Sequence, residues 1–276
     1  MKKLSASIDF RSQNDGSVLL EVAVLDEPAL FGLWTFDICL GGKTLSPVRK
    51  WETVCEHKER NCDYLEIDLP LSNDYRLQRS ILLNHKDKVL LLSDAVLADE
   101  EGMGEILSYR AEFYVSPKLR AKTSDEATEI EFRPVARAAT PAFRVLPLAL
   151  PEWQMAKPAG LVSGTLSTME NMLILRQETT GRSLFAPLFF DLDADRLNKR
   201  YTWRQLSVGE NMQQLRDDQA AGYRIQLGQE QFFVYRSLTT PANRTVLGHN
   251  LIDDFCFARF DPESGVDPLI AVEVTE

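Results

Sequence analysis

Hydrophobic and polar residues alternate with a period of two along most of the chain, a pattern typical of half-buried β-strands. Segment 63–71 shows it clearly, because Glu66 and Asp68 fall on one face and aliphatic side chains fall on the other. The aliphatic residues are Leu65, Ile67, Leu69 and Leu71. Segments 75–83 and 105–115 alternate in the same way. The pattern predicts an all-β protein.

Segment 89–96 is apolar on both faces, which predicts a central strand buried on both sides. Residues 84–88 and 227–230 each join two strand-like runs and therefore predict hairpins. Residues 209–221 have poor helical spacing, so a short helix and an irregular or extended segment both stay open there.

A proline-rich stretch separates two strand-rich regions. Its prolines are Pro141, Pro147, Pro151 and Pro158. Such a stretch is either an interdomain linker or a long crossover within one sandwich. We prefer the crossover, because both flanking regions end in open-sheet patterns that need covering. The sequence thus predicts a single large two-sheet antiparallel β-sandwich over residues 1–276, with halves 1–138 and 160–276 joined by the crossover 139–159.

The 276 residues carry a formal net charge of −10, and the acidic excess is present in both halves. An evenly acidic chain argues against nucleic acid or an anionic membrane as a partner, since phosphate groups need a basic face. No apolar run approaches the roughly 20 residues of a membrane-spanning helix. The start, MKKLSASIDF, lacks the apolar core of a signal peptide. We therefore expect no membrane partner and, by default, a cytoplasmic location.

The stretch from Asp63 to Val96 resembles the β-sandwich region of heparinase II/III-like and related polysaccharide lyases. The shared pattern is a strand of alternating acids and aliphatics, an arginine-containing strand, a charged hairpin, and a hydrophobic strand that ends in Asp. The residues that carry it here are Glu66 and Asp68, Arg76 and Arg79, Lys86 to Lys88, and Leu90 to Asp94.

The resemblance implies a supersandwich, the architecture that galactose-mutarotase-like proteins also use. The related lyases carry a helical toroid before the sandwich, and their catalytic Tyr, His and Asn lie mainly there. This sequence has no helical region that could form such a toroid. The resemblance therefore implies an accessory sandwich of a glycan-processing protein and not lyase activity.

The stretch RTVLGHNLIDDFCFARFDPESG, from Arg244 to Gly265, concentrates polar side chains. We predict one strand over 251–260, with His249 and Asn250 in a loop at its entrance. In such a strand Asp254 needs an arginine partner. The candidates are Arg236, Arg224 and Arg244. A buried pair of this kind predicts that Asp254→Ala costs about 3–5 kcal/mol.

The candidate ligand-binding residues are His249, Asn250, Arg236, Arg244, Arg259 and Asp254. No metal site and no cofactor are predicted, because Cys55 and Cys62 around His57 match no standard zinc spacing. An Asp191, Asp193, Asp195 series lacks the glycine and glutamate of a calcium loop. Six aromatic residues are candidates for stacking on sugars: Trp34, Trp51, Trp153, Trp203, Tyr223 and Tyr235.

Three functions stay open. We predict a non-catalytic, accessory β-sandwich module of a carbohydrate-processing protein, which binds glycan or docks an adjacent protein domain. The second is a sugar-active enzyme of mutarotase or epimerase type, which needs a general acid and a general base in one cleft. His249 with Asp254 or Glu52, or His57 or His85 with a distant carboxylate, would supply these groups. The third is a structural protein-interaction domain.

Overall fold

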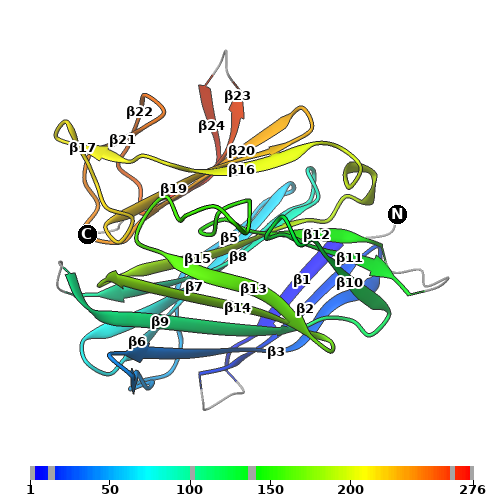
Figure 1. The fold of residues 1–276 in the computed structure, drawn as a ribbon, viewed down its shortest axis with the longest axis horizontal. Coiled ribbons are helices and arrows are strands. Elements are labelled where there is room, and N and C mark those ends of the chain that lie inside the picture. The colour runs from blue at the N-terminus through cyan, green and yellow to red at the C-terminus, as the bar shows by residue number, and fades with distance from the viewer. Residues whose placement is uncertain (1–3, 12–15, 100–102, 136–140, 262–264, 274–276) are drawn as a thin grey trace.

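The computed structural model describes residues 4–11, 16–99, 103–135, 141–261 and 265–273. The regular secondary structure of these residues is β-strand, apart from one short 3₁₀ helix, η1 (Ala194–Arg196). The strands make four antiparallel sheets that stack in layers (Figure 1). The prediction of an all-β sandwich is confirmed, and the described chain has four sheets where the sequence indicated two.

One outer layer is a seven-stranded sheet in the order β1-β2-β3-β9-β14-β13, with β4 beside β3. Its strands are β1 (Leu4–Asp9), β2 (Val18–Val24), β3 (Glu27–Leu40), β4 (Lys43–Thr44), β9 (Met103–Tyr114), β13 (Ser163–Met169) and β14 (Met172–Gly181). The sheet combines strands from both predicted halves, since β14 pairs with β9 along most of its length.

The central layer is an eight-stranded sheet in the order β10-β11-β12-β15-β8-β7-β6-β5. Its strands are β5 (Glu52–Lys58), β6 (Cys62–Leu71), β7 (Tyr75–Asn84), β8 (Val89–Ala98), β10 (Leu119–Thr123), β11 (Ile130–Pro134), β12 (Phe143–Pro147) and β15 (Leu184–Asp191). Part of the predicted proline-rich crossover is therefore strand β12, while residues 136–140 lie outside the described chain. Pro147 is the last residue of β12.

The third layer is a five-stranded sheet in the order β16-β19-β20-β23-β24, with a small four-stranded sheet, β18-β17-β21-β22, beside it. The larger sheet contains β16 (Tyr201–Leu206), β19 (Ala220–Leu227), β20 (Glu230–Ser237), β23 (Phe255–Asp261) and β24 (Gly265–Val272). The smaller contains β17 (Gly209–Glu210), β18 (Gln213–Gln214), β21 (Arg244–Val246) and β22 (His249–Leu251). Residues 209–221 thus form short strands joined by turns, and no helix.

The central sheet is buried on both faces, because one hydrophobic core lies between it and the seven-stranded sheet and another lies between it and the third layer. On β8, Leu90 and Leu92 contribute to the first core, whereas Leu91 and Ala95 contribute to the second. The prediction that segment 89–96 is buried on both sides is confirmed.

The first core contains a completely buried ion pair. Nε and Nη2 of Arg79 donate to the two carboxylate oxygens of Asp94 at 2.8 and 2.7 Å, and both side chains have no exposed surface. Nη1 of Arg79 donates to the carbonyl of Trp34, and the hydroxyl of Tyr109 donates to Asp94. The guanidinium also lies 3.7 Å from the centroid of the Trp34 ring. These contacts join the two sheets through polar groups as well as apolar ones.

The prediction of one continuous strand over 251–260 is wrong. β22 ends at Leu251 and β23 begins at Phe255, and these two strands belong to different sheets. The intervening residues cross between the sheets, which a single straight strand cannot do. The backbone of Asp254 is held in this crossing, because its N–H donates to Val272 and its carbonyl accepts from Ser237.

The organisation as a single domain stays a prediction. We expect one calorimetric unfolding transition, because β9 and β14, from opposite halves, share a sheet and a core. Limited proteolysis near residues 147–158 should not release two stable fragments. Two separated transitions together with two folded fragments would show that the halves are independent.

Candidate ligand-binding site

Arg236 is the centre of a buried polar cluster between the central sheet and the third layer. β20 directs Arg236 to the same side as Phe232 and Val234, because alternate residues of a strand share a face. There it meets Glu66 of β6, where Nη1 donates to Oε2 at 2.8 Å and Nη2 donates to Oε1 at 3.4 Å. Two residues far apart in the sequence thus form one ion pair.

Three more side chains complete this cluster. Nη2 of Arg236 also donates to Oε1 of Gln78 and lies 3.2 Å from Oδ2 of Asp254. The hydroxyl of Tyr64 donates to Oε2 of Glu66. Hereafter Tyr64, Glu66, Gln78, Arg236 and Asp254 are the Arg236 cluster. The predicted arginine partner of Asp254 is therefore Arg236, and not Arg224 or Arg244.

Burial and charge act together on the cluster's ionisation. Burial raises the pKa of Tyr64 well above its usual value, and the Glu66 carboxylate adds to the rise. Burial opposes the charged form of Arg236, but Glu66 and Asp254 outweigh it and raise the pKa of the guanidinium. Burial raises the pKa of Asp254, while Arg236 works against the rise. Arg236 therefore stays charged and Tyr64 stays neutral.

An open cavity of about 580 Å³ lies against this cluster, and its volume is within the range of small-ligand sites. Glu66, Gln78 and Asp254, the three side chains that contact Arg236, line it. We call it the Arg236 pocket. Its other polar lining side chains are Arg76, Asp99, Thr239, Thr240 and Glu273.

The lining groups define what the Arg236 pocket can do chemically. Hydroxyl, amide, carboxylate and guanidinium groups offer hydrogen-bond donors and acceptors together. No aromatic ring and no histidine is among the described lining residues, so the pocket offers neither ring stacking nor an imidazole for proton transfer. It is suited to hydrogen-bonded recognition of a polar ligand.

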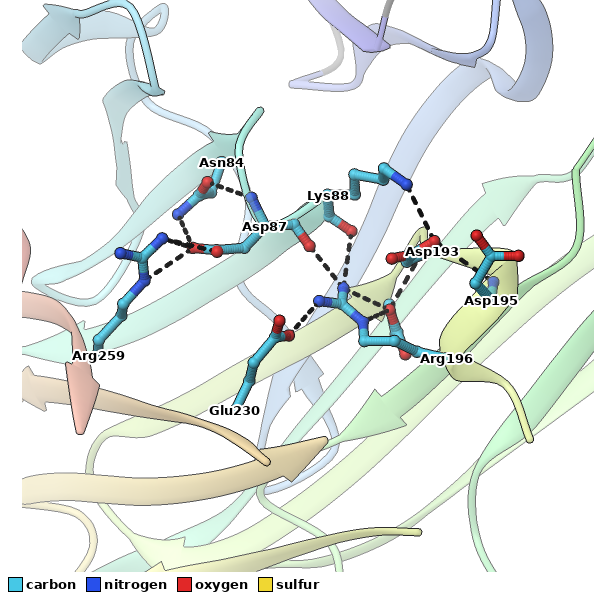
Figure 2. A network of polar contacts seen from close by, with 9 residues as sticks. Asn84, Asp87, Lys88, Asp193, Asp195, Arg196, Glu230 and Arg259 are labelled. Carbon is cyan, nitrogen blue, oxygen red and sulfur yellow. Dashed lines mark hydrogen bonds and ion pairs between the residues drawn. The ribbon is translucent and has the colours of Figure 1, made fainter. Parts of the chain in front are cut away.

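Arg259 of β23 lies beside the hairpin turn 84–88 (Figure 2). This turn is at the opposite end of β7 from the Arg236 cluster. Its Nη2 lies 2.7 Å from both carboxylate oxygens of Asp87, and its Nε donates to Oδ2 at 3.1 Å. Asn84 closes the turn, since its Oδ1 accepts from the backbone N–H of Asp87 and its Nδ2 donates to the Asp87 carboxylate. Arg259, predicted as a ligand-binding residue, thus contacts a turn of the central sheet.

Arg196 of η1 holds the same turn from another side (Figure 2). Its Nη2 donates to the carbonyl of Asp87 at 2.6 Å and to Oδ1 of Asp191 at 2.7 Å. Its Nη1 pairs with Glu230 of β20. Asp191 is the last residue of β15 and Asp193 is the N-cap of η1, so this acidic series is a strand end followed by a helix cap.

A cavity of about 710 Å³ opens beside this turn, and His85 and Lys88 line it. Nε2 of His85 lies 2.8 Å from Oδ2 of Asp63, and Nζ of Lys88 lies 3.0 Å from Oδ1 of Asp193. We call it the turn pocket. A histidine paired with a carboxylate is an arrangement that general-base catalysis uses.

The remaining predicted residues lie elsewhere. Arg244 of β21 is buried, and its Nε and Nη1 donate to Glu210 at 3.0 Å and to Ser237 at 2.7 Å. His249 and Asn250 are on strand β22 and not in a loop, because a tight turn at 247–248, with positive φ at both residues, pairs β22 with β21. Of the six predicted ligand-binding residues, Arg236 and Asp254 form an ion pair, whereas Arg244, His249 and Asn250 share the β21–β22 hairpin.

Sequence reasoning missed Glu66 and Gln78, and it named His85 with a distant carboxylate without identifying that carboxylate as Asp63. Glu66 was placed on the correct face of its strand, opposite the aliphatic residues, but that face was expected to meet solvent. The third layer covers it and leaves Glu66 with no exposed surface. No local signal distinguishes Gln78, whereas Asn84 and Asp87 have the spacing of a side-chain-closed turn.

The structure also shows where the possible metal ligands and the six aromatic candidates for sugar stacking lie. In the described part of the chain, no three His, Cys, Asp or Glu side chains gather where they could hold a metal ion. Of the six aromatic candidates for sugar stacking, Trp153 is exposed. The buried ones are Trp34, Trp51, Trp203, Tyr223 and Tyr235. No helix among the described residues is long and apolar enough to span a membrane.

No protein-family model matches the chain, and no curated protein matches its sequence. Solved structures do resemble it. Heparan sulfate lyase HepC from Pedobacter heparinus has a TM-score of 0.49 and 10% identity, over 86% of this chain and 41% of that one. A heparinase III gene product has a TM-score of 0.48 and 10% identity, over 81% and 36%. The fold resembles a heparinase-like β-sandwich.

A GH36 alpha-galactosidase from Geobacillus stearothermophilus is also similar, with a TM-score of 0.38 and 11% identity over 68% of this chain and 39% of that one. A heparan sulfate lyase and a heparinase III are among these structures, and residues 63–96 resemble the same group of proteins. The chain spans about two fifths of the length of these structures. No residue role is transferred from them, because identities this low concern the fold alone.

Proposed function

We propose that the chain is an accessory β-sandwich module of a carbohydrate-processing protein and that it binds glycan in the Arg236 pocket. One observation carries this proposal. Glu66, Gln78 and Asp254 line the pocket, and all three contact the same buried guanidinium. Their positions are set before a ligand arrives, so binding does not carry the cost of ordering them.

The composition of the pocket wall supports a glycan as the ligand. A sugar hydroxyl is both a donor and an acceptor, and the wall offers both kinds of partner. Thr239 and Thr240 contribute hydroxyl groups, and Arg76 contributes a guanidinium that is half exposed. Hydrogen bonds to charged groups are the stronger ones, so Arg76 and the accessible carboxylates of Asp99, Asp254 and Glu273 would dominate the affinity. Glu66 is fully buried and acts by positioning Arg236.

Binding is better supported than catalysis in this pocket. General acid–base catalysis needs a group that exchanges its proton near the working pH. Glu66 and Asp254 share one arginine, and Glu66 has no exposed surface from which to reach a substrate. With no histidine among the described lining residues, the groups here suit recognition.

Calorimetric titration with neutral oligosaccharides, including N-acetylglucosamine oligomers, tests the proposal. We expect saturable binding that Arg76→Met and Asp254→Asn each weaken by about tenfold or more, because a hydrogen bond to a charged group contributes about 1.5–3 kcal/mol. Arg120→Met, at an exposed arginine of β10, is the matched control and should leave the affinity unchanged. Absence of binding, or binding that survives both pocket substitutions, would refute the proposal.

A second candidate, a sugar-active enzyme of mutarotase type, is favoured by one observation, the His85–Asp63 pair at the turn pocket. It predicts that the protein speeds the optical equilibration of a freshly dissolved hexose and that His85→Ala removes the effect. His57→Ala, at a partly exposed histidine of β5 that pairs with Glu59, is the control. If the unmodified protein gives no acceleration in polarimetry, this candidate is eliminated.

A further inference from the structure

The Arg236 pocket contains more negative than positive charge. Its lining includes the carboxylates of Glu66, Asp99, Asp254 and Glu273. Arg76 is the single cation among the described lining residues, and its Nη1 already lies 4.0 Å from Oδ1 of Asp68, which is not part of the lining. The lining therefore has a surplus of carboxylates.

The buried guanidinium behind the wall does not remove this surplus. Arg236 pairs with both Glu66 and Asp254, and the more distant charges of Arg76 and Arg244 also act on Asp254. Asp99 and Glu273 are exposed and have no ion pair within the described part of the chain. Glu66 and Asp254, next to Arg236, are thus partly neutralised. Asp99 and Glu273, which we call the rim of the pocket, keep their negative charge.

Burial and the negative charge of the lining raise the pKa of two of its titratable groups. Burial raises the pKa of the Cys55 thiol, and the carboxylate of Glu66 raises it further. Burial also raises the pKa of Asp254, and Glu66 acts in the same direction against the opposing effect of Arg236. Both observations are consistent with a pocket in which added positive charge is favourable.

We infer that the Arg236 pocket selects sugars that carry a free ammonium group, such as the 2-amino-2-deoxyhexose units of an oligosaccharide, over neutral and anionic sugars. The inference rests on the proposed function, because it names the ligand class of the same site. An ammonium group supplies three donors and a positive charge to carboxylates that lack a cation. A sulfated or uronate sugar is repelled by the same rim.

The experiment compares two glucosamine oligomers of equal length, one fully N-acetylated and one fully deacetylated. They differ in charge at the amine and share the sugar ring. Calorimetry is done at a slightly acidic pH at which the free amines are protonated. We expect the deacetylated oligomer to bind roughly tenfold more tightly, and we expect this ratio to decrease as salt is added.

Substitutions at the rim test the cause of the preference. Asp99→Asn combined with Glu273→Gln should bring the affinity ratio close to one, because it removes the two carboxylates without an ion pair. Asp267→Asn removes one exposed carboxylate of β24 outside the pocket and should leave the ratio unchanged. A heparin-type sulfated oligosaccharide provides the anionic comparison and should not bind.

The outcomes separate this inference from the proposed function. If both oligomers bind equally well, the ammonium preference is wrong and the glycan-binding proposal stands. If neither binds, both are wrong. Tighter binding of the sulfated oligosaccharide, or a ratio that the rim substitutions leave intact, overturns the inference. A preference that the rim substitutions abolish and Asp267→Asn retains supports it.

Discussion

Replacing Asp94 by alanine is expected to lower the free energy of unfolding by about 3–5 kcal/mol. Asp94 forms a two-pronged pair with Arg79, and neither side chain has any exposed surface. The substitution leaves a guanidinium between two sheets with no carboxylate and no access to water. The hydroxyl of Tyr109 loses its acceptor as well. Urea unfolding followed by circular dichroism measures the loss.

Two comparisons isolate the buried charge as the cause. Asp37→Ala removes a carboxylate that is 69% exposed, so it should change stability by no more than about 0.5 kcal/mol. The double variant Arg79→Met with Asp94→Leu should regain most of the stability, because replacing a whole buried pair by hydrophobic residues is often neutral. An Asp94→Ala protein as stable as the Asp37→Ala protein would contradict this account.

Glu66→Ala is expected to be the other severe substitution, also with a loss of about 3–5 kcal/mol. Glu66 is the partner of the fully buried Arg236, and its own side chain is 1% exposed. After its removal, Arg236 retains Asp254, at 3.2 Å, and the neutral amide of Gln78. Tyr64 also loses the acceptor of its hydroxyl. The same urea experiment gives the magnitude.

The comparison with Asp254 makes this prediction specific. Asp254→Ala should cost only about 1–2 kcal/mol, because Arg236 then keeps Glu66 and because Asp254 is partly exposed. From the sequence alone, the loss of about 3–5 kcal/mol was expected for Asp254→Ala. The contacts of Arg236 instead make Glu66→Ala the substitution with the larger expected loss. Glu21→Ala, at an exposed position of β2, is the control for the Glu to Ala change. A larger loss for Asp254→Ala than for Glu66→Ala would reverse the assignment.

Only part of the candidate site was predictable from the sequence. A carboxylate next to buried positions needs a cation, which correctly indicated an arginine partner for Asp254. The rule cannot choose among several arginines, and it does not reveal that Arg236 serves a second carboxylate. Glu66 and Arg236 are separated by 170 positions, so no local pattern connects them. Their contact requires the third layer to lie on the central sheet.

The sequence by itself determined several of the strands and the face of each that is apolar, although it was wrong about the single strand over 251–260. Alternation in 63–71 placed Ile67 and Leu69 on the apolar face of their strand, and both lie in the first core. The uniformly apolar segment 89–96 was predicted to be buried on both sides, and it contributes to both cores. These features are local, because the side chains of successive strand residues point to opposite faces.

Only the tertiary structure decided what each polar face meets. In the sequence Glu66 has the pattern of a solvent-facing residue, yet a sheet from the other end of the chain covers it and supplies Arg236. Likewise, Arg259 contacts Asp87 across 172 positions. Polar residues tolerate either water or a charged partner, so their pattern along a strand cannot distinguish the two. The stacking of the layers makes that choice.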